Sequence, residues 1–185
     1  MAIFAFYRRA ACSFGRFARE ARGLAALEFA LLLPVMLTLF LGSYEVTNAV
    51  AIQRKVTLTA RALADLASQF TSIANSDMSN ILNASSDIIA PYASANLQVV
   101  VSELSINAQG QASVVWSSTL NGTALAVGQV VTIPSSLAVP NTYLLLGQAS
   151  YSYNPTYGYV VTGTLSLSDQ MLLAPRQSNS VARTS

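Results

Sequence analysis

The feature that most constrains this chain is a run of 21 mostly apolar residues, Leu24 to Tyr44, whose only charged residue is Glu28. A helix of that length rises about 31 Å at 1.5 Å per residue, close to the thickness of a bilayer core. The run therefore predicts a transmembrane helix at residues 24–44. A carboxylate inside such a helix costs roughly 2.5 to 3.5 kcal/mol near its centre and usually faces a partner. Glu28 is thus the first candidate site residue, and a carboxylate that snorkels to the interface or is protonated is the alternative.

Charge is sparse, and its distribution predicts an orientation. Charged residues make up 10% of the chain, against about a quarter of a typical soluble domain. Five arginines precede the apolar run, and the one acid among them is Glu20; the arginines are Arg8, Arg9, Arg16, Arg19 and Arg22. Because positive residues mark the cytoplasmic flank of a membrane helix, we expect the N-terminus inside and the bulk of the chain outside. Nucleic-acid binding is not expected, since the downstream region lacks a basic stripe.

The residue types that are missing exclude several kinds of chemistry. The chain has no histidine, and its single cysteine is Cys12. Histidine-based acid–base catalysis, a Ser-His-Asp triad, histidine-ligated metals and an intrachain disulfide are therefore excluded. The downstream acids are too scattered to predict a metal or cofactor site. We expect no enzyme; a Ser-Lys or paired-carboxylate hydrolase is the remaining catalytic alternative, and the only lysine, Lys55, lies in the helical region.

A helical periodicity continues beyond the apolar run to Phe70, with apolar residues recurring every three or four positions. This pattern predicts an amphipathic helical extension at residues 45–70. Its packing face comprises Ala49, Ile52, Val56, Leu63, Leu66 and Phe70. We expect this face to cover its own domain, with pairing to another subunit as the alternative. Arg61 and Asp65 fall off this face, one turn apart, where they can pair.

Two further residues of the long helix are candidates. Pro34 removes a backbone donor and predicts a helix kink, although proline is common in membrane helices. Glu45 lies on the apolar stripe just past the apolar run, where it could contact another subunit. A position in solvent or among lipid headgroups is the alternative for Glu45.

The remaining sequence predicts a small α+β domain at residues 71–176. Two short helical turns, at residues 78–82 and 87–90, precede a region rich in Val, Tyr, Thr and Leu. Five segments of that region are typical of strands: residues 97–104, 112–119, 129–133, 143–153 and 159–167. We expect a meander of about five antiparallel strands, with one face buried by the helix. Tyr143, Tyr151, Tyr153, Tyr157 and Tyr159 could pack across strands or form a contact surface. Residues 177–185 are expected to be a flexible tail.

The start of the apolar run resembles a known processing site. A basic leader, residues 1–23, ends in Gly23, and Glu28 is the fifth residue after it. This arrangement resembles the type IV pilin-like proteins, which are cleaved after such a glycine. The stretch that begins with Glu28 and Phe29, with Pro34, Gly42 and Glu45 downstream, resembles the TadE-like family of the tight-adherence, or Flp-type, pilus machinery.

The resemblance implies a minor pseudopilin of the bacterial inner membrane with a periplasmic domain, acting in bacterial adhesion. A prepilin peptidase would cleave between Gly23 and Leu24, and Glu28, Phe29 and Glu45 would contact other pilin-like or Tad pilus subunits. In pilin-like proteins the glutamate pairs with the new N-terminal amine of a neighbour, here that of Leu24. The alternative is an uncleaved, membrane-anchored adaptor or scaffold for a pilus or secretion machinery. A signal peptide cleaved near residues 49–51 is disfavoured, because the apolar run is too long.

Overall fold

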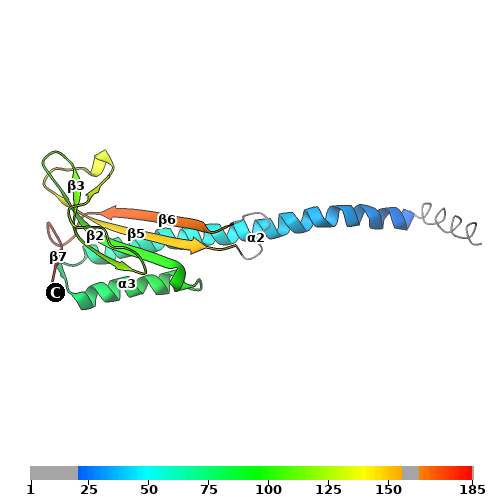
Figure 1. Ribbon diagram of the computed structural model, residues 1–185, viewed down its shortest axis with the longest axis horizontal. Helices are drawn as coiled ribbons and strands as arrows, with labels where there is room; N and C mark the ends of the chain where they lie inside the picture. The colour runs from blue at the N-terminus through cyan, green and yellow to red at the C-terminus, as the bar shows by residue number, and fades with distance from the viewer. Residues whose placement is uncertain (1–20, 156–162, 185) are drawn as a thin grey trace, which may run out of the picture. The chain divides into compact units, whose positions relative to one another are not determined.

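The computed structural model describes residues 21–155 and 163–184, with side chains from Leu24 onward (Figure 1). The described residues fall into two compact units: 21–46, and 47–155 with 163–184. We call the second unit the α+β domain and describe each unit by itself. The predicted last hairpin loop, with Tyr157 and Tyr159, lies outside the described residues.

The predicted N-terminal helix is confirmed as α2, which runs from Ala21 to Ser68. Its apolar side chains between Leu24 and Phe40 are exposed on every side of the helix, which is typical of a helix that lies in lipid or against other helices. By length and composition this helix is a candidate membrane span. It ends two residues before the expected boundary at residue 70, where Gln69 and Phe70 form a turn.

The predicted pair of short helical turns is wrong, because one helix, α3, spans Asn75–Ile89. Its buried residues recur at helical spacing and make one continuous face: Met78, Ile81, Leu82, Ser85 and Ile89. The many Ser and Asn residues between them are weak helix formers and obscured this periodicity. The backbone N–H of Ala74 donates to Asp77 Oδ2 at 3.3 Å, which satisfies a donor at the start of the helix.

A five-stranded antiparallel sheet confirms the predicted α+β class. Its strands are β2 (Leu97–Ile106), β3 (Ala112–Leu120), β4 (Val130–Val131), β5 (Tyr143–Tyr153) and β6 (Leu165–Leu173). The order is β4-β3-β2-β5-β6, so the expected meander is wrong: β5 pairs with β2 and not with β4. The physical reason is that β4 has only two residues, and the chain between β3 and β5, which includes the short helix η2 (Ser135–Leu137), folds over the sheet instead of extending it.

The last predicted strand is displaced along the chain. We expected a strand at residues 159–167, whereas β6 spans Leu165–Leu173 and residues 159–162 lie outside the described part. Gly163 has φ +96° and forms a bend just before β6. Asp169 and Gln170 interrupt the apolar pattern and hid the true strand. Asp169 is accommodated because its Oδ2 accepts a hydrogen bond from Thr57 Oγ1 on α2 at 2.5 Å.

Two cores form on opposite faces of this sheet. The larger core lies between the sheet and the helices α2 and α3, which run alongside it in Figure 1. The smaller core lies on the other face, where Leu125, Val131 and Ile133 of the segment between β3 and β5 pack on Leu104, Val114 and neighbouring residues. Alternation of side chains along each strand supplies both faces. The remainder of that second face carries polar side chains.

Gly147 in the middle of β5 sets how closely α2 approaches the sheet. A Cβ atom built at Gly147 would lie 2.4 Å from the backbone oxygen of Ala60 and 3.1 Å from Ala64 Cβ. Glycine in a strand interior often marks such a close approach of another backbone. The helix therefore packs on β5 through two alanines and the bare backbone of one glycine.

The C-terminal residues correct another expectation, since the predicted flexible tail is folded. Val181 is fully buried, and β7 (Ala182–Arg183) pairs in parallel with β1 (Ser72–Ile73). The guanidinium of Arg183 donates to the backbone oxygen of Ile73 at 3.0 Å and to Asn75 Oδ1 at 2.8 Å. Polar composition suggested fraying, but the chain end is held by backbone pairing and by one buried valine.

Candidate functional site

The residues of the predicted processing and assembly site all lie on α2. Gly23 and Leu24 are both within the helix, and Leu24 and Phe29 are exposed, as is Glu28. Leu24 and Glu28 are four residues apart and therefore lie on one face of the helix. The structure thus presents a carboxylate on a continuous apolar surface, one turn from the position at which a cleaved chain would begin.

The helix continues through Pro34 without a break. Thr38 donates a hydrogen bond from its hydroxyl to the backbone oxygen of Pro34 at 2.8 Å, and Ser43 donates in the same way to Leu39 at 2.7 Å. These bonds satisfy polar side chains within the apolar half of α2 by using the helix's own carbonyl groups. The kink at Pro34 stays a prediction.

Glu45 is buried, with 2% of its surface exposed. A position in solvent, one of the alternatives considered from the sequence, is therefore wrong for Glu45. A buried carboxylate is uncommon unless it is paired or hydrogen-bonded. Assembly contact through Glu45 stays a prediction.

The predicted packing face lies where the sheet and α3 meet α2. Ile52, Val56 and Leu63 are fully buried, and Leu66 and Phe70 pack partly buried against the same core. Ala49 is partly exposed. Sequence periodicity missed three small buried residues that share this interface: Ala60, Ala64 and Ala67. This face packs against the sheet and α3 of its own domain, which is the first of the two roles expected from the sequence.

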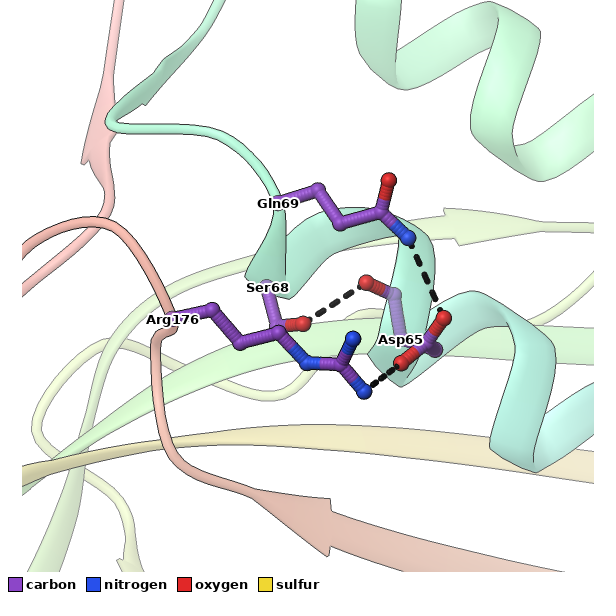
Figure 2. Close-up of polar contacts among 4 residues, drawn as sticks. All are labelled: Asp65, Ser68, Gln69 and Arg176. Atoms are coloured by element: carbon purple, nitrogen blue, oxygen red, sulfur yellow. Dashed lines mark hydrogen bonds and ion pairs between the residues drawn. The ribbon is translucent and has the colours of Figure 1, made fainter.

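The end of α2 is joined to the C-terminal segment by a set of polar contacts that the sequence did not predict (Figure 2). Arg176 forms an ion pair with Asp65, and the backbone N–H of Arg176 donates to the oxygen of Ser68 at 2.9 Å. Gln69 Nε2 also donates to Asp65 at 3.1 Å. The expected partner of Asp65, Arg61, is replaced by a residue 111 positions away in sequence. A cation here also complements the negative end of the helix dipole.

A second unpredicted cluster surrounds Glu103, which is 2% exposed. The backbone N–H of Val181 donates to Glu103 Oε1 at 2.5 Å, and Trp116 Nε1 donates to the oxygen of Val181 at 2.8 Å. Burial raises the pKa of Glu103, while the hydrogen bonds from Val181 and Trp116 act in the opposite direction. One carboxylate and one indole thereby hold the C-terminal segment in the core.

The raised pKa of Glu103 predicts a pH dependence of stability. The folded state holds this proton more tightly than the unfolded state, so the resulting stabilisation is complete below pH 4.5, the ordinary pKa, and is lost as pH rises through the raised folded pKa. Glu103→Gln removes the titrating group. We expect the unfolding midpoint of this variant in urea, measured on the full chain in detergent from about pH 4 to about pH 8, to vary less with pH than that of the wild type.

The matched control for this experiment is Asp87→Asn, because Asp87 is an exposed acid on α3. This variant should keep the wild-type pH profile. Equal pH profiles for wild type and Glu103→Gln would contradict the assignment.

No group of three or more acidic or cysteine residues that could hold a metal occurs among the described residues. Of the tyrosines considered from the sequence, Tyr157 and Tyr159 lie outside the described residues, and Tyr153 packs against the larger core. Tyr151 is buried and meets Tyr92 edge to face, with ring centroids 6.5 Å apart, whereas Tyr143 and Tyr153 are partly exposed. The described residues include an exposed apolar segment of α2 with one carboxylate, which is a surface suited to association, and a domain whose C-terminal segment is held in its core.

Comparison with models of protein families gives a match that falls on α2. Residues 23–65 match the family of TadE-like proteins, so the match covers less than a quarter of the chain. It includes all five residues of the predicted processing and assembly site, among them Glu45, and extends to Asp65. No curated protein and no solved structure matches the chain. The α+β domain beyond α2 is therefore described from its own geometry.

Proposed function

We propose that this chain, which is TadE-like over residues 23–65, is a minor pseudopilin or pilus-assembly protein of a Tad-type pilus. The observation that carries the proposal is the coincidence of the family match with the exposed apolar segment of α2, residues 24–40, whose one carboxylate is Glu28. In this proposal a prepilin peptidase cleaves between Gly23 and Leu24, and the chain is a substrate of that enzyme and not itself an enzyme.

The chemistry of Glu28 supports an assembly role. Cleavage would give Leu24 a positively charged amine at the end of an apolar helix. Within a bundle of such helices the amine and the carboxylate are each costly to bury alone, but they compensate each other when they are paired. A helix that bears both charges can pair its carboxylate with a neighbour's amine, which fixes the register between subunits. Phe29, exposed beside Glu28, supplies apolar contact area in the same interface.

The proposed location follows from the arginines of residues 1–23 and the span that begins at Leu24. The N-terminus would lie in the bacterial cytoplasm and the α+β domain in the periplasm, with incorporation in a pilus after processing. The positive-inside tendency supports this orientation.

The experiment that tests the proposal is N-terminal sequencing and intact-mass measurement of the protein from its native membranes, with and without the prepilin peptidase. We expect a chain that starts at Leu24 when the peptidase is present and at Met1 when it is absent. Replacing Gly23 with a bulkier residue should block the cleavage, whereas an equivalent change at Gly42 should not.

A chain that starts at Met1 in both strains would contradict processing and would favour the permanently anchored adaptor. A start near Ile52 would show that the apolar run is a cleaved signal peptide.

A further inference from the structure

The polar part of the sheet face that points away from α2 forms a groove with a volume of about 540 Å³. The register of β2, β5 and β6 aligns the side chains of the groove in two rows, each with one residue from every strand. One row is Gln98, Ser150 and Ser168, and the other is Val100, Gln148 and Gln170. Their neighbours Val99 and Ala149 point into the core beneath α2, so alternation turns both rows to the opposite face. The volume is in the range typical of small-ligand sites.

One side of the groove is formed by the turn after β3. Gly122 and Thr123 lie there, and a Cβ atom at Gly122 would meet Thr119 Oγ1 at 3.0 Å and Gln98 Cβ at 3.4 Å. Asn121, just before it, has φ +56°, and its side-chain amide donates to the oxygen of Leu97 at 3.1 Å. The turn is therefore fixed against β2, and the groove has a defined rim.

The chemistry of the lining is neutral and rich in hydrogen-bonding groups. Three amides and three hydroxyls line the groove: Gln98, Gln148, Gln170, Thr123, Ser150 and Ser168. Each glutamine offers two donors and one acceptor oxygen, and each hydroxyl can donate and accept. Gln148 Nε2 donates to Gln170 Oε1 at 3.2 Å, which orients both amides before any ligand arrives.

The charges around the groove exclude other ligand classes. No lysine or arginine occurs among the described lining residues, so the groove lacks a counter-charge for phosphate or carboxylate. Asp169 lies between the two rows, but its Oδ2 accepts from Thr57 on α2 and its Oδ1 accepts from the backbone of Gln170. Val100 is the apolar side chain of the described lining, because the side chain of Ala149 points into the core on the opposite face. One such side chain offers too little apolar surface for an apolar ligand.

We propose that this groove binds a short, uncharged oligosaccharide through the side chains of Gln98, Gln148 and Gln170. Neighbouring strands place hydrogen-bonding groups about 4.8 Å apart, a spacing comparable with the size of one pyranose ring. Such a ligand carries many hydroxyl groups and no charge, which matches a lining of amides and hydroxyls. The proposal is independent of processing at Gly23 and of pilus assembly.

The test is isothermal titration calorimetry of the full chain in nanodiscs of neutral lipid. The probes are fully N-acetylated chitotetraose and cellotetraose, both uncharged. We expect saturable binding of at least one of them. The double variant Gln148→Ala/Gln170→Ala should weaken that binding at least tenfold, because two orienting amides are lost. Gln109→Ala, at an exposed glutamine in the turn between β2 and β3, is the matched control and should bind as the wild type does. Circular dichroism melting curves establish that each variant is folded.

The two probes distinguish the source of the ligand. Preference for chitotetraose would indicate a glycan of N-acetylated amino sugars, and preference for cellotetraose a neutral hexose polymer; either result supports the proposal. Binding of neither sugar would overturn it, as would equal affinity in the double variant. Self-association of the chain that is lost in the double variant would assign the groove to a second copy and would also overturn it.

Discussion

Replacing Gly147 with alanine is expected to lower the free energy of unfolding of the α+β domain by about 3 kcal/mol, the upper end of the usual cost of overpacking. The added Cβ would lie 2.4 Å from the backbone oxygen of Ala60 and 3.0 Å from the backbone nitrogen of Ala64. Backbone atoms of a helix cannot rotate away as a side chain can, so α2 itself must move from the sheet. Urea unfolding of the full chain in detergent, followed by the fluorescence of Trp116, measures this loss.

The matched control is Gly128→Ala. No heavy atom lies within 4 Å of a Cβ atom at Gly128, whose φ is +81°, so this alanine has only the left-handed backbone to accommodate, at a cost of roughly 1 kcal/mol. A second control, Ala64→Gly combined with Gly147→Ala, should restore little stability, because the contact with the Ala60 oxygen remains. Equal losses for Gly147→Ala and Gly128→Ala would show that the close approach of α2 is not what makes glycine necessary.

The substitution Glu28→Gln is expected to reduce assembly of the chain into pili at least a hundredfold while leaving its amount in the membrane fraction unchanged. This prediction depends on the proposed function. Removing one partner of a buried ion pair typically costs about 3 to 5 kcal/mol, since the other charge is left uncompensated, and each 1.4 kcal/mol corresponds to about a tenfold change in an association constant. A neutral amide is easier to place in lipid than a carboxylate, so insertion should not suffer.

The control for this experiment is Thr38→Val, which removes a polar group from the same exposed half of α2. The Thr38 hydroxyl donates to a backbone carbonyl of its own helix, and such a bond contributes little net free energy. Removing this hydroxyl should therefore leave assembly within about twofold of the wild type. Shear-released pili and membrane fractions from each strain give both quantities. A wild-type pilus yield from Glu28→Gln would contradict the role of the carboxylate.

The expected locations of α2, β2, β3 and β5 agree with the structure because each depends on a local pattern. Periodic apolar residues predicted the helix up to its last turn, and runs of β-branched and aromatic residues between Gly and Asn predicted the strands. The alternation of apolar and polar residues up to Ser168 predicted the last strand at residues 159–167, whereas β6 continues through Asp169 to Leu173. The carboxylate is tolerated in the strand by a hydrogen bond from Thr57, a contact between residues that are 112 positions apart in sequence.

The candidate site divides in the same way. Gly23, Leu24, Glu28 and Phe29 stay a predicted processing and assembly site, since their spacing is a local property of the chain and the fold of the α+β domain does not test it. The attachment of the C-terminus was missed because no local pattern marks it: Arg176 pairs with Asp65, and Val181 is held by Glu103 and Trp116. The one large apolar residue of the tail, Val181, was the available signal.

The sequence by itself determined the apolar helix with its single carboxylate, the α+β class and the exclusion of histidine chemistry, since these follow from composition and from periodicities over neighbouring residues. Only the tertiary structure decided that β5 lies beside β2, that α2 packs directly on Gly147, that the C-terminus is part of the core, and that three glutamines from three strands line one groove. These features depend on pairings between distant residues, where the free energy of packing selects one arrangement among several that the same local patterns allow.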